Sequence, residues 1–384
     1  MSLRRRAPLA ALAALLVFAG CSNDEVVEPP KELVDFDAKV AVQRAWSASV
    51  GGGDDTLRLA LAPSVDESRV YAAGRDGDVY AFDAANGRTL WRTRTELPLS
   101  AGPAAGSGLV VAGASDGQVV ALDAATGAKR WQVRLSGEVL AAPAVSGTAV
   151  IVRTVDGFVR GLAPADGREL WADEEQVPRL TLRGTAAPVI AGDTVITGFD
   201  NGKVAAYALD NGDILWETAV SPPRGRTELE RLVDIDGTLG VSGRDVFAVG
   251  FQGRAAMLAL DSGQIWWARD LSSHRGLALD GETLYATAAD STVQALRRRD
   301  GTPVWSSDVL ARRSLTAPAI DGERLVVADF EGYVHWLDRT DGTVVGRARA
   351  GGGRVTNAPV VANGLVYVQS DDGRLTAFRA GERG

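Results

Sequence analysis

The fold is decided by the stretch VVAGASDGQVVALDAATGAKRW, residues 110–131. Apolar runs lie on either side of Asp116-Gly117, a pair that tolerates the positive φ of a tight hairpin. The second run ends at Asp123, and Trp131 follows four residues after Gly127. The stretch therefore predicts three consecutive antiparallel strands, of which the last carries a tryptophan.

This unit recurs along the chain, and its closing position can be followed from one copy to the next. The separations are 45, 40, 40, 45, 51, 38 and 41 residues, and the positions are Trp46, Trp91, Trp131, Trp171, Trp216, Trp267, Trp305 and Gly346. A proline marks the start of a further, innermost strand in five units: Pro103, Pro143, Pro188, Pro318 and Pro359. A period near 40 with four strands per unit is typical of a β-propeller blade. The sequence predicts an all-β fold with eight four-stranded antiparallel blades.

The two ends of the chain are expected to meet in one blade. The eighth unit, residues 365–381, stops before an outer strand, whereas residues 42–46 read as an outer strand without a blade. Pairing the N-terminal strand with the C-terminal blade closes the ring and removes an exposed edge. We expect a propeller that is monomeric outside any complex, with two less regular places, residues 242–250 and Gly346.

The N-terminus reads as an export signal. Arg4, Arg5 and Arg6 precede an apolar run over residues 7–19, which at thirteen residues is shorter than the ~20 that a membrane-spanning helix needs. Phe18-Ala19-Gly20-Cys21 resembles a bacterial lipobox, and the resemblance implies acylation of Cys21, the only cysteine. A signal peptide with a chance cysteine is the alternative.

The expected domains follow from that assignment. Residues 1–20 form the signal peptide, residues 21–40 the lipidated cysteine and a flexible tether, and residues 41–384 the propeller. Because Ser22 rather than Asp follows the cysteine, analogy favours the outer membrane, with the protein lipid-anchored and facing the periplasm.

Composition excludes several classes of function. Lys and Arg total 41 against 49 Asp and Glu, a net charge of -8, so nucleic acid is not an expected partner. Two histidines and one cysteine leave no metal site or disulfide framework, and no catalytic residue or cofactor is predicted. The tryptophans could be stacking platforms, but their once-per-unit placement favours packing between blades. The repeated aspartates, such as Asp83, Asp123 and Asp338, are interpreted as turn caps.

Two connections between adjacent blades carry insertions relative to the standard connection. Trp171 to Pro188 takes 17 residues where Trp131 to Pro143 takes 12, and the next unit also carries an insertion, residues 228–234. Crossovers of adjacent blades emerge on one face, so the insertions should be neighbours. Exposed leucines beside an arginine are typical of an interaction surface. The alternative is that these leucines cover the blade below.

The repeat resembles the pyrroloquinoline-quinone-type propeller repeat, which is best preserved at residues 121–131. That family includes quinoprotein dehydrogenases, which carry a vicinal cysteine pair and acidic metal ligands. This chain has one cysteine, which the lipobox resemblance assigns to the anchor, so an enzyme is not expected.

Three motifs narrow the resemblance: Leu-x-Leu-Arg-Gly at residues 180–184, Thr-Glu-Leu-x-Arg-Leu-x-Asp-x-Asp at 227–236 and Glu-Gly-Tyr-x-His-Trp at 331–336. Together they resemble the lipoprotein subunits of the outer-membrane β-barrel assembly (BAM) machinery. The resemblance implies a non-enzymatic scaffold that binds the periplasmic POTRA domains of BamA, with other BAM subunits and nascent β-barrel proteins as further partners. Carried over by motif, the BamA-contacting residues are Leu180, Leu182, Arg183, Asp234 and Asp236. The alternatives are a scaffold of another envelope complex or, more remotely, a quinone-dependent periplasmic dehydrogenase.

Overall fold

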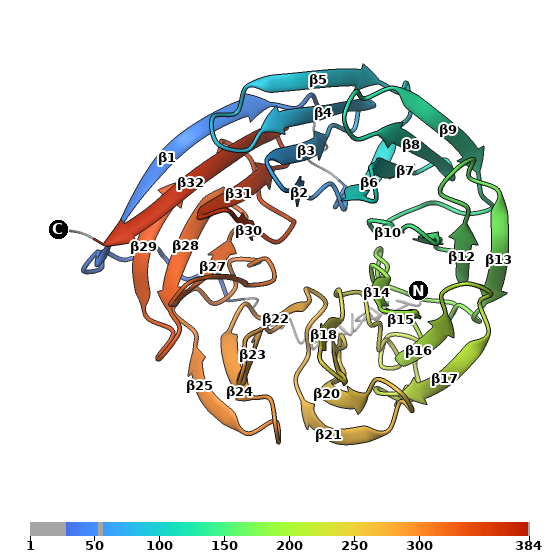
Figure 1. Cartoon of the computed structure of the whole chain (residues 1–384). Helices are drawn as coiled ribbons and strands as arrows, with labels where there is room; N and C mark the ends of the chain where they lie inside the picture. The colour runs from blue at the N-terminus through green and yellow to red at the C-terminus, as the bar shows by residue number, and fades with distance from the viewer. Residues whose placement is uncertain (1–27, 53–56, 383–384) are drawn as a thin grey trace, which may run out of the picture.

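The computed structural model describes residues 28–52 and 57–382, and there the chain forms eight four-stranded antiparallel sheets arranged in a ring (Figure 1). The predicted eight-bladed propeller is confirmed. Blades 1 to 4 are β2(Ser64–Asp66), β3(Arg69–Ala73), β4(Asp78–Asp83), β5(Thr89–Arg94); β6(Leu99–Gly106), β7(Leu109–Ala114), β8(Gln118–Asp123), β9(Lys129–Arg134); β10(Ala144–Val145), β11(Val150–Arg153), β12(Phe158–Leu162), β13(Glu169–Glu174); and β14(Val189–Ala191), β15(Thr194–Gly198), β16(Lys203–Ala208), β17(Ile214–Ala219).

Blades 5 to 7 continue the same order, and residues 242–250, which we expected to be less regular, lie in a regular four-stranded blade. Their strands are β18(Gly240–Ser242), β19(Asp245–Val249), β20(Arg254–Ala259), β21(Ile265–Asp270); β22(Leu277–Leu279), β23(Thr283–Thr287), β24(Val293–Arg297), β25(Pro303–Ser307); and β26(Ala319–Asp321), β27(Arg324–Ala328), β28(Tyr333–Asp338), β29(Val344–Arg349). Blade 8 comprises β30(Val360–Ala362), β31(Leu365–Ser370), β32(Arg374–Glu382) and β1(Val40–Ser49).

Each tryptophan of the repeat joins its own blade to the next one. Its indole Nε1 donates to a backbone carbonyl of the following blade, for example Trp131 to Pro164 O at 2.8 Å. The ring lies under the glycine of that blade's outer turn: a Cβ built on Gly127 would lie 2.6 Å from the ring of Trp91. The prediction that the tryptophans pack between blades is confirmed. The turn aspartates also cap as expected, since Asp123 Oδ1 accepts from Ala125 N and Thr126 N.

The ring closes through the two ends of the chain. β1 pairs antiparallel with β32 from Val40 opposite Glu382 to Ser49 opposite Arg374, so the N-terminal strand is the outer strand of blade 8 (Figure 1, blue beside red). Gly346, which replaces the tryptophan of blade 7, lies against this strand.

The described residues before β1 lie along the propeller. Lys31 Nζ forms an ion pair with Asp308 at 2.7 Å, Leu33 packs on the core near blade 7, and Arg347 lies over the Phe36 ring at 4.8 Å. The signal peptide and Cys21 fall outside the described residues, so the lipid anchor stays a prediction. In the described part of the chain, no helix has the length and apolar character needed to cross a membrane.

Candidate functional site

The two long crossovers lie side by side on one face of the ring. The first, residues 175–188, joins β13 to β14, and the second, residues 220–239, joins β17 to β18. Leu182 N in the first donates to a carboxylate oxygen of Asp234 in the second. Ile235 N donates to Phe199 O at 3.1 Å, which anchors the second crossover on blade 4. The adjacency predicted from loop lengths is confirmed.

The first crossover presents an apolar residue and a cation to solvent. The side chain of Leu180 is 43% exposed. Arg183 is exposed as well and pairs with Glu138 at 3.0 Å, a surface ion pair that contributes little to stability. Leu182 is half-buried at the wall of the central cavity. Leu180 and Arg183 therefore have the exposure that a docking surface needs.

The second crossover contains a short turn closed by a capping box. Glu230 Oε2 accepts from Arg226 N at 2.7 Å and from Thr227 N, while Thr227 Oγ1 accepts from Glu230 N at 3.2 Å. Within this turn Leu229 is 64% exposed, whereas Leu232 is buried. The alternative that these leucines cover the blade below is correct for Leu232 but wrong for Leu229.

Unlike Leu180 and Leu229, the two motif aspartates are not exposed to solvent. Asp234 is fully buried, and Asp236 is half-buried at the cavity wall. Burial raises the pKa of Asp234 to about 7, while its hydrogen bond from Leu182 acts in the opposite direction. Burial and the charges of Asp200 and Asp234 raise the pKa of Asp236 well above its ordinary value. Asp234 therefore acts as a positioning residue that holds Leu182.

Beneath these aspartates lies a buried ion pair between two blades. Arg153 Nη2 contacts Asp200 Oδ1 at 2.7 Å, and the Arg153 guanidinium lies over the Phe199 ring at 4.9 Å. Both residues of the pair are buried. One cation and three carboxyl groups thus share this region, which agrees with the raised pKa of Asp234 and Asp236.

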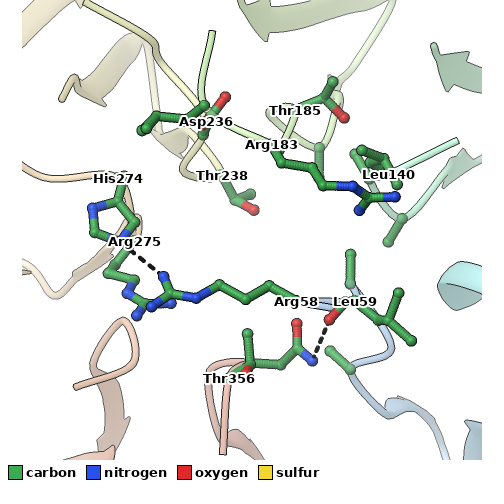
Figure 2. A pocket seen from close by; sticks show the side chains of 18 of the residues that line it. Arg58, Leu59, Leu140, Arg183, Thr185, Asp236, Thr238, His274, Arg275 and Thr356 are labelled. Atoms are coloured by element: carbon green, nitrogen blue, oxygen red, sulfur yellow. Dashed lines mark hydrogen bonds between the residues drawn. The ribbon is translucent and has the colours of Figure 1, made fainter. Parts of the chain in front are cut away.

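Crossovers from around the ring enclose a central cavity of about 610 Å³ (Figure 2). Leu182, Arg183 and Asp236 lie on its wall, and so do Arg58 and Arg275. The sequence analysis missed these last two arginines, because each is a single residue outside any of the motifs. Among residues 28–52 and 57–382, no group of three His, Cys, Asp or Glu side chains is placed to hold a metal ion.

The comparisons with known proteins agree with one another. The family profile described as outer membrane protein assembly factor BamB matches residues 75–307 and 289–383. BamB of Pseudomonas aeruginosa is 44% identical over 370 residues, which cover 96% of this chain and 97% of that protein. BamB of Marinobacter adhaerens is 54% identical over 314 residues, covering 82% and 80% respectively.

Solved structures also show similarity to BamB. The crystal structure of BamB from Moraxella catarrhalis has a TM-score of 0.80 at 30% identity and covers 88% of this chain and 100% of that one. A quinohemoprotein alcohol dehydrogenase from Comamonas testosteroni has a TM-score of 0.68 at 14% identity, which shows the shared fold alone. The BamB relatives are outer membrane protein assembly factors by name, and this chain is likewise non-enzymatic. The chain belongs to the BamB family of outer membrane protein assembly factors.

Proposed function

We propose that this chain is a lipid-anchored scaffold of the BAM complex that faces the periplasm and docks on the POTRA domains of BamA. Cys21 carries the lipid, and the chain that follows it connects the anchor to the propeller. In this role the protein assists the assembly and insertion of β-barrel proteins without performing chemistry. Other BAM subunits and nascent barrels are its further partners.

The observation that carries the proposal is the hydrogen bond from Leu182 N to Asp234. It joins the two long crossovers into one surface, which we call the docking ridge: Leu180, Leu182, Arg183 and Leu229. Leu180 and Leu229 are exposed and do not belong to the core, and Arg183 is exposed as well. An apolar contact flanked by an arginine is the usual composition of a binding hot spot.

The residues of the docking ridge and the two aspartates beneath it have different parts in the proposal. Leu180 and Leu229 bury apolar surface against the partner, and Arg183 exchanges its weak contact with Glu138 for a carboxylate of the partner. Asp234 fixes the backbone at Leu182 from below. Asp236 lies beside Gly184, where a Cβ would approach its carboxylate to 3.0 Å, so it supports the same turn.

The test is a calorimetric titration of the chain without its lipid, residues 22–384, against the POTRA domains of BamA from the same organism. We expect saturable binding by the wild type and loss of at least about tenfold in affinity for Arg183→Glu. Arg88→Glu is the matched control, because Arg88 is exposed in the turn between β4 and β5, on the opposite face. Equal affinity of Arg183→Glu and wild type, with unchanged melting, would contradict the proposed docking surface.

A further inference from the structure

Two arginines meet on the wall of the central cavity without an acidic partner between them. Arg58 comes from the connection between β1 and β2, and Arg275 from the connection between β21 and β22. Figure 2 shows the Arg58 side chain extended across the cavity toward Arg275 and His274. Like charges repel, so such an arrangement in a protein of net charge -8 asks for an explanation.

The hydrogen bonds leave most of the N–H groups of this pair unused. Arg58 Nη1 lies 3.4 Å from His274 Nε2, which then accepts the bond. Among residues 28–52 and 57–382, the Arg275 guanidinium donates to no acceptor, and neither arginine forms an ion pair. A guanidinium carries several N–H donors in a planar fork that matches a carboxylate or a phosphate.

Arg275 stays charged at neutral pH although its surroundings oppose the charge. Burial lowers the pKa of Arg275 to about 10, helped by the charges of Arg58 and Arg354, while Asp371 acts in the opposite direction. Asp371 accepts from Arg354 Nε at 2.7 Å, so its charge is shared with a third arginine. Burial and the two neighbouring arginines lower the pKa of His274 to about 4, so this imidazole is neutral at pH 7.

Apolar side chains line much of the rest of the wall, where Arg183, Asp236 and three threonines also lie. Leu59, Leu140 and Phe251 line it, and Figure 2 shows Leu59 and Leu140 across from the end that holds His274 and Arg275. The volume of about 610 Å³ lies within the range of sites that hold small molecules or a few residues of a peptide. A ligand that fits both halves has one negative group and an apolar body.

We propose that this cavity binds an oxyanion with an apolar body, in which Arg58 and Arg275 hold the carboxylate or phosphate and the leucines contact the body. The proposal does not depend on binding to BamA. It assigns the cavity next to the docking ridge a ligand of its own.

Three probes separate the contributions of charge and apolar contact: N-acetylphenylalanine, its neutral amide N-acetylphenylalaninamide, and inorganic phosphate. Each is titrated by calorimetry into the lipid-free chain at low ionic strength. We expect the carboxylate to bind at least about tenfold more tightly than the amide, and binding to weaken as salt is added. Phosphate binding alone would assign the site to a phosphate group and remove the apolar body from the proposal.

Two variants test the residues. Arg275→Gln and Arg58→Gln should each weaken binding of the carboxylate about tenfold or more, while Arg299→Gln, whose side chain is 83% exposed, serves as control. Arg275→Gln should also leave the melting temperature of the free protein unchanged or raised, because it relieves crowding of like charges. A purely structural arginine would lower it. Equal binding of carboxylate and amide, no saturable binding of any probe, or binding unaffected by both variants would overturn the proposal.

Discussion

Asp234 should make the stability of this protein fall as pH rises toward neutrality. Its pKa is raised from 3.8 to about 7, chiefly by burial, with opposing effects from the hydrogen bond of Leu182 and from Arg153. Since the same carboxyl ionises near 3.8 in the unfolded chain, the folded state binds more protons between these two values. The contribution of the protonated group to stability is therefore complete at low pH and is lost as pH passes through about 7.

The variant Asp234→Asn removes this titration and keeps an oxygen that can accept from Leu182 N. The carboxyl of Asp234 has a pKa of 3.8 in the unfolded chain and of about 7 in the folded protein. At roughly 1.4 kcal/mol per pKa unit, its contribution to the free energy of unfolding changes by about 2 to 3 kcal/mol between about pH 5 and about pH 8. The free energy of unfolding of the variant relative to the wild type should rise by this amount. Taking the difference at each pH cancels His274 and His335, whose lowered pKa values act in the opposite direction.

The assay is urea denaturation followed by tryptophan fluorescence at several pH values and constant ionic strength. Asp270→Asn is the control, because that side chain is 99% exposed. The difference between control and wild type should stay flat across the range. A flat difference for Asp234→Asn as well would refute the account of a buried, partly protonated carboxyl that holds the two crossovers together.

Two further predictions concern the packing between blades. Gly127→Ala should lower the free energy of unfolding by about 2 to 4 kcal/mol, because its Cβ would lie 2.6 Å from the Trp91 ring at a φ of +73°. The control is Gly192→Ala, at a φ of +61° with open space around it, which should cost only about 1 kcal/mol in the same urea assay. Trp131→Phe should cost about 1 to 3 kcal/mol, because it removes the indole donor to the Pro164 carbonyl, and an unchanged urea midpoint would count against that bond.

The fold could be predicted because each blade repeats the same packing arrangement. A turn glycine makes room for a tryptophan of the preceding blade, as Gly127 does for Trp91, so both residues recur with the blade period. The adjacency of the long crossovers followed from loop lengths and from the rule that all crossovers share one face. Neither inference required knowledge of individual side-chain contacts.

The cavity and the state of the aspartates could not be predicted in this way. Arg58 and Arg275 are brought together by closure of the ring, and neither belongs to a spaced motif. The pattern Asp234-Ile-Asp236 suggested two carboxylates on a surface, but the first crossover folds over Asp234 and buries it. Exposure of a loop residue depends on what another loop places above it, which one sequence pattern does not contain.

Closure of the ring explains why Gly346 replaces the tryptophan of the repeat. In the other blades a tryptophan on the outer strand faces a small or flexible residue on the neighbouring strand, as Trp131 faces Ala121, whereas in blade 7 Trp336 faces Gly346. The next blade has no outer turn to receive a tryptophan from position 346, since its outer strand is β1, and a Cβ there already lies 3.2 Å from Val42. The large residue has thus moved to β28, where Trp336 is fully buried.

A double-mutant cycle tests this exchange. Gly346→Trp alone should lower the free energy of unfolding by about 3 kcal/mol or more, although it restores the repeat, because it crowds Trp336 and β1. Trp336→Ala alone should cost about 3 to 5 kcal/mol through the cavity that it leaves. The double variant, which recreates the pairing of the other blades, should be more stable than the sum of the two losses by about 1 kcal/mol or more. Strict additivity in urea denaturation would mean that the two positions do not share one space, and that the missing tryptophan has another cause.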